Sequence, residues 1–257
     1  MSIKNRILRK FGFKKDQNGI INRYLRENGG WQSHLINTKN FIEHSAKAKE
    51  KETCVILGSG WLLDVPVDNL NEIFKKVYLV DIVHPKQIIH KYRKYKNIEF
   101  IKVDISGYIK PVYDFIKKNR KTKTSLNQIV QQFPDDFNKL MNNASMIVSV
   151  NILNQLDILV CDYIKKYEMY SDEEINNFRK IIQQKHIDLM PRNKSCIITD
   201  YEELNYDDNM NLINKKSLIY ANLPKGKAIR EWKWNFDFSK TYHNNYKTVF
   251  NVMAWDL

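Results

Sequence analysis

Two glycines and two aspartates in the first half of the chain have the spacing of a nucleoside-binding site. Gly58 and Gly60 follow the apolar run 53–57, Asp81 comes 23 residues after Gly58, and Asp104 comes 23 residues later again. Glycine permits a tight turn and lets a ligand approach the backbone closely. An acidic side chain at Asp81 can hydrogen-bond both hydroxyls of a ribose, and Asp104 suits an adenine amino group. The spacing therefore predicts one site shared by all four residues.

The same residues discriminate between nucleotide classes. A dinucleotide fingerprint needs a third glycine at position 63, which is Leu63, and no GK[ST] sequence of a phosphate loop follows the glycines. S-adenosylmethionine (SAM) carries no phosphate. Its site needs close backbone approach, a ribose acid and an adenine contact, and the chain offers these three. We therefore predict SAM as the cofactor.

The elements that must position these residues follow from the hydrophobic period. Five apolar runs alternate with helical patterns, which is typical of a parallel sheet with crossover helices. The period-two segment 231–236 and the doubly apolar segment 248–255 predict an antiparallel C-terminal hairpin whose last strand lies inside the sheet. We expect an α/β, Rossmann-like, doubly wound, mostly parallel seven-stranded sheet. Its first five strands are predicted at 53–57, 77–82, 98–103, 145–150 and 195–199.

Helical spacing covers most of the remaining chain. We expect helices over 20–48 with a break at Gly29-Gly30, and over 69–75, 86–95 and 152–167, with a further helix capped by Ser171. Residues 1–50 are predicted to form a basic helical extension that acts as a lid, with Ile3, Ile7, Leu8 and Phe11 turned inward. Residues 51–257 form the Rossmann-like domain, with a helical insertion at about 109–143.

From the glycine pair onward, residues 53–257 resemble a class I SAM-dependent methyltransferase. In that family the last strand is inserted antiparallel between the fifth and sixth, and the strand at 248–255 is similar. The resemblance implies cofactor contacts from Gly58, Ser59, Gly60 and Trp61, a ribose contact at Asp81 beside Ile82, and an adenine site flanked by Asp104 and Ile105. It also implies that Asn151, after the fourth strand, faces the methyl group and the acceptor.

Methyl transfer depends mainly on positioning the acceptor, so a general base is optional. We predict Asn151, Asp200 and His243 as the catalytic residues. His34, His84 and Glu202 are further candidate bases, and Trp31, Trp61 and Tyr201 are candidates for stacking on an acceptor, although such residues more often simply pack. Asp64, two residues before Pro66, is interpreted as a helix cap.

Charge and cysteine content restrict the remaining possibilities. The formal net charge is +13, with 12 Lys or Arg against 4 Asp or Glu in residues 1–51 and five basic residues in 117–123. Three cysteines, none with metal-ligand spacing, indicate no metal site and a reducing, cytoplasmic location. No apolar run approaches the about 20 residues needed to span a bilayer. The oligomeric state stays open.

Three function classes remain. The first is a SAM-dependent methyltransferase, with a small molecule or an RNA as acceptor. The second is a non-catalytic Rossmann-like nucleoside-binding protein, favoured by Ile56 and Leu62, which depart from the family's glycine motif. The third is an RNA-associated basic protein, favoured by the two basic segments, since phosphate contacts depend on Lys and Arg.

Overall fold

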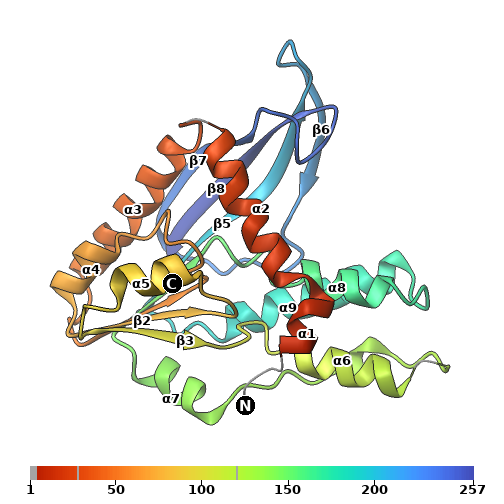
Figure 1. Cartoon of the computed structure of the whole chain (residues 1–257), viewed down its shortest axis with the longest axis horizontal. Helices are drawn as coiled ribbons and strands as arrows, with labels where there is room; N and C mark the ends of the chain where they lie inside the picture. Colours follow the sequence, from red (N-terminus) through yellow and green to blue (C-terminus); the bar gives the residue numbers. More distant parts are fainter. Residues whose placement is uncertain (1–4, 28, 120) are drawn as a thin grey trace.

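The computed structural model describes residues 5–27, 29–119 and 121–257, which fold around one twisted sheet (Figure 1). The strands of this part of the chain are β1 (Thr53–Leu57), β2 (Lys76–Asp81), β3 (Ile98–Lys102), β4 (Met146–Val150), β5 (Ser195–Tyr206), β6 (Leu212–Ser217), β7 (Lys227–Asp237) and β8 (Lys247–Asp256). The helices are α1 (Asn5–Phe11), α2 (Phe13–Arg26), α3 (Gln32–Lys47), α4 (Val67–Ile73), α5 (Lys86–Tyr92), α6 (Ile109–Lys118), α7 (Asp135–Asn143), α8 (Ile158–Lys165) and α9 (Asp172–Asp188), with a 3₁₀ turn, η1 (Leu126–Gln128).

The strand order is β3-β2-β1-β4-β5-β8-β7. Strands β1 to β5 pair in parallel, and β8 runs antiparallel to both of its neighbours, β5 and β7. Val249, Phe250, Val252 and Ala254 are all buried, because β8 is covered on both faces. The predicted fold class, including the inserted last strand, is therefore confirmed, but the sheet has eight strands in the described residues and not the seven expected, because β6 pairs with β5.

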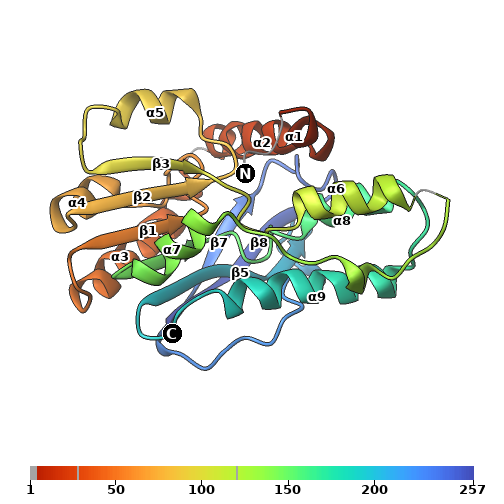
Figure 2. The ribbon, with the colours of Figure 1, turned by 90° about the horizontal axis from the view of Figure 1, so that it is seen from below.

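Helices cover both faces of the sheet (Figure 2). Phe41 of α3 and Leu70 of α4 pack on one face with Ile56 and Val148, while Met141 of α7 packs on the other face with Val55. A third apolar cluster joins α1, α6, α8 and α9 beside the sheet. Because helices cover both faces of the sheet, side chains on both sides of β1 and β4 face the core, and both strands are continuous apolar runs.

The edge at β5 differs from the sequence-based prediction. The strand was expected to end at residue 199, but it continues to Tyr206 and pairs with β6, which was not predicted. All six residues of β6 are exposed, so β6 lacks the alternating burial that reveals a strand in sequence. Helix α8 also starts later than predicted, at Ile158, because residues 152–157 form turns.

The N-terminal helices lie over the carboxyl edge of the parallel strands. Gly12, with φ +90°, separates α1 from α2, and α2 runs across this edge toward β7 (Figure 1). Leu8 and Phe11 of α1 are buried, and the Phe11 ring stacks on Tyr163 of α8 at 4.3 Å between centroids. Ile3, which was expected to point inward as well, lies outside the described residues.

Among the described helices, none combines the length and the apolar character that crossing a bilayer requires.

Candidate functional site

The glycine loop turns sharply where β1 ends. Gly58 has φ +84°, and a Cβ added to it would lie 2.0 Å from Ile152 Cγ2 and 2.8 Å from the Val150 carbonyl oxygen. Its N–H and that of Ser59 donate to the Val80 carbonyl, at 3.0 and 3.2 Å, which ties the loop to β2. Gly60 differs, because a Cβ there would meet nothing closer than 3.8 Å. The loop is therefore close-packed at Gly58 and open at Gly60, where a ligand has room to approach the backbone.

Asp81 lies directly beside this loop. Its Oδ2 accepts a hydrogen bond from the Gly60 N–H at 2.8 Å, and its Oδ1 accepts one from the Val83 N–H at 3.2 Å. Burial raises the pKa of Asp81, while the charge of His84 and the two backbone donors oppose that rise. The glycine loop and the acid of the predicted motif, 21 residues apart at Gly60 and Asp81, are thus in contact.

Asp104 forms hydrogen bonds within its own turn. Its Oδ1 accepts from the Ser106 N–H at 3.0 Å and from the Ser106 hydroxyl at 2.6 Å, and its Oδ2 accepts from the Ile109 N–H at the start of α6 at 2.8 Å. Ile105 packs into the sheet core with Val103 and Phe137. Asp104 therefore stabilises the turn after β3 and accepts the first backbone N–H of α6.

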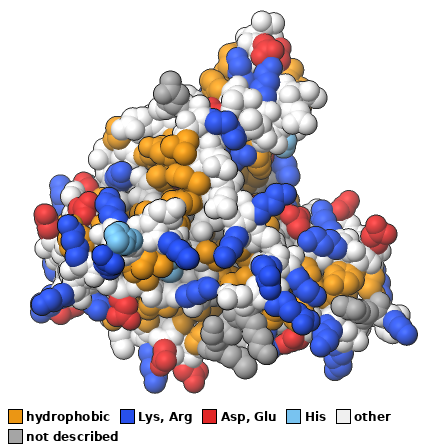
Figure 3. Space-filling model, viewed as in Figure 1, with side chains coloured by type: hydrophobic (Ala, Val, Ile, Leu, Met, Phe, Trp, Pro, Cys, Tyr) orange, Lys and Arg blue, Asp and Glu red, His pale blue; other side chains and the backbone are white. Residues whose placement is uncertain are grey.

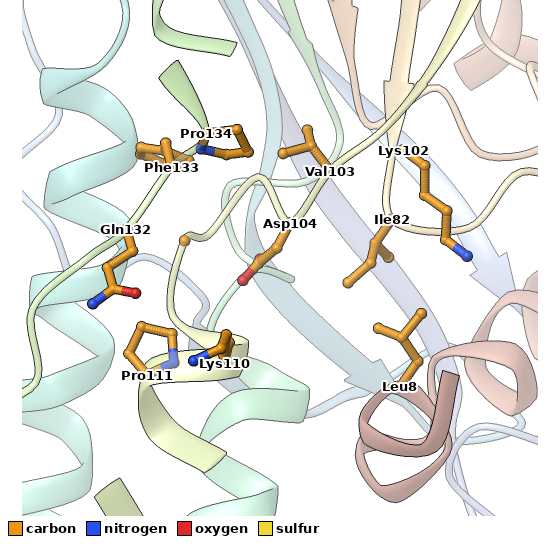
Figure 4. Close-up of a pocket in the computed structure, with 11 residues that line it drawn as sticks. Leu8, Ile82, Lys102, Val103, Asp104, Lys110, Pro111, Gln132, Phe133 and Pro134 are labelled. Atoms are coloured by element: carbon orange, nitrogen blue, oxygen red, sulfur yellow. The ribbon is translucent and has the colours of Figure 1, made fainter. Parts of the chain in front are cut away.

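A cavity of about 120 Å³ adjoins this turn (Figure 4). Leu8 of α1 and Ile82 after β2 point toward each other on one side, and Gln132, Phe133 and Pro134 lie on the opposite side, with Asp104 between. Ligand pockets usually enclose about 300–1,000 Å³. The cavity therefore adjoins Asp104, the residue predicted to contact adenine, and is smaller than a whole ligand.

Asn151 stands at the end of β4 in a left-handed conformation, with φ +48°. Its Nδ2 donates to Asp64 Oδ2 at 2.7 Å and lies 3.2 Å from His34 Nε2. Trp232 donates its indole N–H to His34 Nδ1 at 3.1 Å. Burial lowers the pKa of His34 to about 3, so this imidazole is neutral. The interpretation of Asp64 as a helix cap is wrong, since Pro66 holds the cap position of α4 and the Asp64 carboxylate bonds Asn151.

Asp200 is buried near the end of the parallel part of β5. Only 2% of it is exposed, and its Oδ2 accepts a hydrogen bond from Asn154 Nδ2 at 2.7 Å. Burial raises its pKa to about 6. A bulge between Asp200 and Glu202 shifts the register against β8, so Asp200 pairs with Val252 and Glu203 with Phe250. Because residues two apart on β8 share a face, the bulge places Asp200 and Glu203 on the same face.

His243 lies near Glu203 rather than at the glycine loop. Its Nε2 is 2.7 Å from Glu203 Oε1, and Glu203 also accepts a hydrogen bond from Asn205 Nδ2 at 2.9 Å. The buried carboxylate therefore orients the imidazole. Sequence analysis missed Glu203, because one acidic residue in a polar stretch gives no signal until the bulge is known.

The other candidates have structural partners. Trp31 donates its indole N–H to the Phe236 carbonyl within the core, and His84 Nε2 lies 3.1 Å from the Ile101 carbonyl. Tyr201 donates to Glu231, and Glu202 binds Asn251 and Lys215 on the β5–β6–β8 extension. Of the stacking candidates, Trp61 contacts helix α2.

Helix α2 is attached to the loops after β1 and β2. Trp61 donates its indole N–H to the Gln17 carbonyl at 2.8 Å, and the Gln17 side chain donates to the Val83 carbonyl at 2.5 Å. Further along, Glu27 accepts from the Phe238 N–H at 2.8 Å, and Arg23 lies 3.8 Å from Asp237. One residue, Gln17, thus connects α2 to the glycine loop and to the turn that follows Asp81.

The polar atoms left over at this edge test whether a nucleoside with a polar tail fits. Within the described part of the chain, four buried atoms at the ends of β1, β4 and β5 have no hydrogen-bond partner: Ser59 Oγ, Asn151 Oδ1, Asn154 Oδ1 and Asp200 Oδ1. Buried polar atoms in proteins are normally paired. Together with the open space at Gly60 and the carboxylate of Asp81, they fit SAM and a polar acceptor.

Comparisons with known proteins give similarities at low identity. No family model and no curated protein matches the chain. Among solved structures, the N-methyltransferase NodS from Bradyrhizobium japonicum WM9, in complex with S-adenosylhomocysteine, is 9% identical, with a TM-score of 0.36 over 90% of this chain and 86% of that chain. A DhpI–S-adenosylhomocysteine complex is 7% identical, with a TM-score of 0.39 over 96% and 95%. A precorrin 8W decarboxylase from Methanobacterium thermoautotrophicum is 11% identical, with a TM-score of 0.34 over 86% and 90%. The fold assignment rests on the strand order of the chain itself.

Proposed function

We propose that this protein binds SAM at the carboxyl edge of the sheet and transfers its methyl group to an acceptor. The observation that carries the proposal is the 2.8 Å hydrogen bond from the Gly60 N–H to Asp81 Oδ2, which sets the carboxylate that we propose as the ribose ligand beside an open glycine backbone. The strand order, with β8 antiparallel between β5 and β7, supports it.

In this proposal each residue has a defined task. Gly58, Ser59, Gly60 and Trp61 hold the methionine end, and Asp81 binds the ribose hydroxyls. Ile82 contacts the adenine, while Asp104 and Ile105 shape the wall of its cavity. SAM, when bound, supplies an electrophilic methyl group on a sulfonium, so that the protein mainly orients and desolvates the acceptor.

The acceptor side is assigned to the ends of β4 and β5. Asn151 positions the acceptor near the methyl group, and Asp200 takes up an acceptor proton because its raised pKa of about 6 makes it a better base than an ordinary Asp. His243, oriented by Glu203, passes protons to solvent.

Residues 1–50 act as a lid on the domain 51–257 in this proposal. Leu8 forms a wall of the cavity, and Gln17 bonds both Trp61 and the Val83 carbonyl. The cavity is smaller than the cofactor, so we expect α1, whose Leu8 lines it, to move when SAM binds.

Thermal unfolding with millimolar SAM, S-adenosylhomocysteine, NAD or ATP in parallel tests the cofactor. A ligand at about 100 times its Kd stabilises the folded state by about 2.7 kcal/mol, a rise of several degrees in Tm. We expect that rise with the two adenosyl-sulfur ligands only. A rise with NAD or ATP instead rejects the proposal. No rise with any of the four ligands also rejects it and favours a non-catalytic protein.

The variant Asp81→Ala tests the site itself. It removes the ribose acid, which is also the acceptor of two backbone N–H groups, so we expect affinity for S-adenosylhomocysteine to fall at least about tenfold. Asp68→Ala, at an exposed position in α4, is the matched control and should leave the affinity unchanged. Circular dichroism confirms that both variants are folded. Unchanged affinity in folded Asp81→Ala contradicts the site.

A further inference from the structure

The surroundings of Tyr242 are acidic, although the chain is strongly basic. The formal net charge is +13, and Lys and Arg side chains are spread across the face in Figure 3, with acidic side chains mainly near its margins. Carboxylates from two elements act electrostatically on Tyr242, namely Asp16 on α2 and Asp200 and Glu203 on β5. Charge reversal at one place on a basic protein indicates the charge of what that place binds.

Contacts in the structure place Tyr242, Glu203 and Asp200 near one another. The rings of Tyr242 and His243 lie 4.5 Å apart between centroids, His243 Nε2 lies 2.7 Å from Glu203 Oε1, and Glu203 shares a face of β5 with Asp200. The pKa of Tyr242 is raised to about 12, first by burial and then by the negative charges of Glu203, Asp200 and Asp16, with Arg23 opposing. Asp16 is exposed, but partial desolvation still raises its pKa; the charge of Arg23 opposes the rise and that of Asp162 on α8 adds to it. The phenol therefore lies within electrostatic reach of carboxylates from both the lid and the sheet.

The basic groups at this place are already engaged. The Arg23 guanidinium lies 3.8 Å from Asp237 and stacks over the rings of Phe236 and Tyr242. His243 Nε2 lies 2.7 Å from Glu203. Asp16, Asp162 and Asp200 have no basic side chain within salt-bridge distance in the described residues. The local charge is therefore negative.

A second observation points independently to a ligand. Asp200 is 2% exposed, and its Oδ1 finds no hydrogen-bond partner in residues 5–27, 29–119 or 121–257. Asn154 Oδ1, beside it, and Asn151 Oδ1 are likewise buried and unpaired over these ranges. All three are acceptors as placed, and buried acceptors without donors are costly. A ligand that brings several N–H donors satisfies them.

We propose that the methyl acceptor is an aliphatic amine that binds as an ammonium ion at Asp200 and Glu203, with the charge of Asp16 acting at longer range. This inference rests on the proposed function for its chemistry and on the acidic side chains for the substrate class. An ammonium supplies three N–H donors and the opposite charge. An RNA acceptor is disfavoured, because its phosphates meet carboxylates at this place.

The chemistry balances with the groups present. The bound ammonium gives one proton to the Asp200 carboxylate and becomes a neutral amine with a free electron pair. The amine nitrogen forms a bond to the methyl carbon, and the sulfur keeps the electron pair of the bond that breaks. The product leaves as an N-methylammonium ion, and Asp200 returns its proton to solvent.

Isothermal titration of the full chain with n-butylamine, 1,4-diaminobutane and the neutral analogue n-butanol tests the substrate class, with and without S-adenosylhomocysteine. We expect the amines to bind and n-butanol not to bind. Asp200→Asn should weaken amine binding at least about tenfold, and Asp16→Asn, at an exposed position, about two- to fivefold. Glu72→Gln, which removes an exposed negative charge from α4, is the control and should not change it.

The outcomes separate this inference from the proposed function. If S-adenosylhomocysteine binds but the amines bind no better than n-butanol, the substrate class is wrong while methyl transfer stands. Equal losses in Asp16→Asn and Glu72→Gln also overturn the inference, since they indicate only net charge. Transfer of labelled methyl to an RNA oligonucleotide and not to the amines has the same effect. Amine binding without cofactor binding supports the ammonium site but rejects the proposed function, and with it the role of the amine as methyl acceptor.

Discussion

At the scale of single residues, Gly58 combines two separate reasons for being glycine. Its φ of +84° disfavours any L side chain, and an added Cβ would also collide with Ile152. Gly12 has a similar φ of +90° but open space around its Cβ position. The pair therefore separates backbone strain from steric exclusion.

We predict that Gly58→Ala lowers the free energy of unfolding by about 3 kcal/mol or more, because strain and overpacking add. Gly12→Ala, with strain alone, should lower it by about 1 kcal/mol. Urea unfolding of both variants measures the difference. Equal losses would mean that Ile152 moves aside and that the loop is not close-packed.

Residue-level prediction from sequence succeeds where a side chain has a fixed place in a repeating unit. Gly60 and Asp81 follow successive parallel strands, so their contact is implied by the spacing. Asp64 was misinterpreted, because a nearby proline supports a local cap equally well and its partner Asn151 is 87 residues away. The roles proposed for Asn151, Asp200 and His243 remain predictions.

At the scale of elements, α2 is held at this edge by polar contacts and by the partly buried Ile20 and Tyr24, and none of its residues is fully buried. Such an element opens at low free-energy cost compared with a core helix. Gln17 and Trp61 supply contacts to the two loops, and each can be removed by one substitution.

We predict that Gln17→Ala and Trp61→Phe each increase amide hydrogen exchange across residues 13–26 by about three- to tenfold, the equivalent of one hydrogen bond. Hydrogen-exchange mass spectrometry measures it. Gln32→Ala, at an exposed position in α3, is the control. Exchange at the wild-type rate in both variants would show that α2 is held by other contacts and would weaken its role as a lid.

For the strands of the parallel sheet, most predicted ends lie within one residue of the observed ends, because continuous apolar runs bounded by turns are distinctive. The sequence does not predict β6 or the outer half of β5. The outer half of β5 carries polar residues such as Glu202 and Asn205, and it pairs with the exposed β6. Neither segment therefore shows the apolar alternation that reveals a strand in sequence.

At the scale of the whole molecule, buried histidines and carboxyls have opposite effects on stability. Burial lowers the pKa of His186 to about 4 and of His34 to about 3, so the unfolded chain takes up protons first as pH falls below about 6.5, and stability is lost. Asp157 and Asp200, with pKa values of about 6, take up protons in the folded state first, and stability is gained below pH 6.

We predict that His186→Gln removes one side of this balance. Between pH 7 and pH 5, the change in the free energy of unfolding of His186→Gln should be more favourable to the folded state than the change in the wild type, by about 2 kcal/mol. Urea unfolding at the two pH values measures it, with the exposed His90→Gln as control. Parallel pH responses of wild type and His186→Gln would contradict a neutral buried His186.

The position of β8 has a consequence for how the protein is made. Strand β8 fills the gap between β5 and β7, so the sheet stays split until residue 256 has been synthesised. At about 5–20 residues per second, the 50 residues after β5 take about 2.5–10 s to emerge from the ribosome. During that interval β5 is an unpaired apolar edge, which invites pairing with another nascent chain. The interval before β8 completes the sheet is thus also the time at which a chaperone has most to protect, namely the unpaired edge of β5.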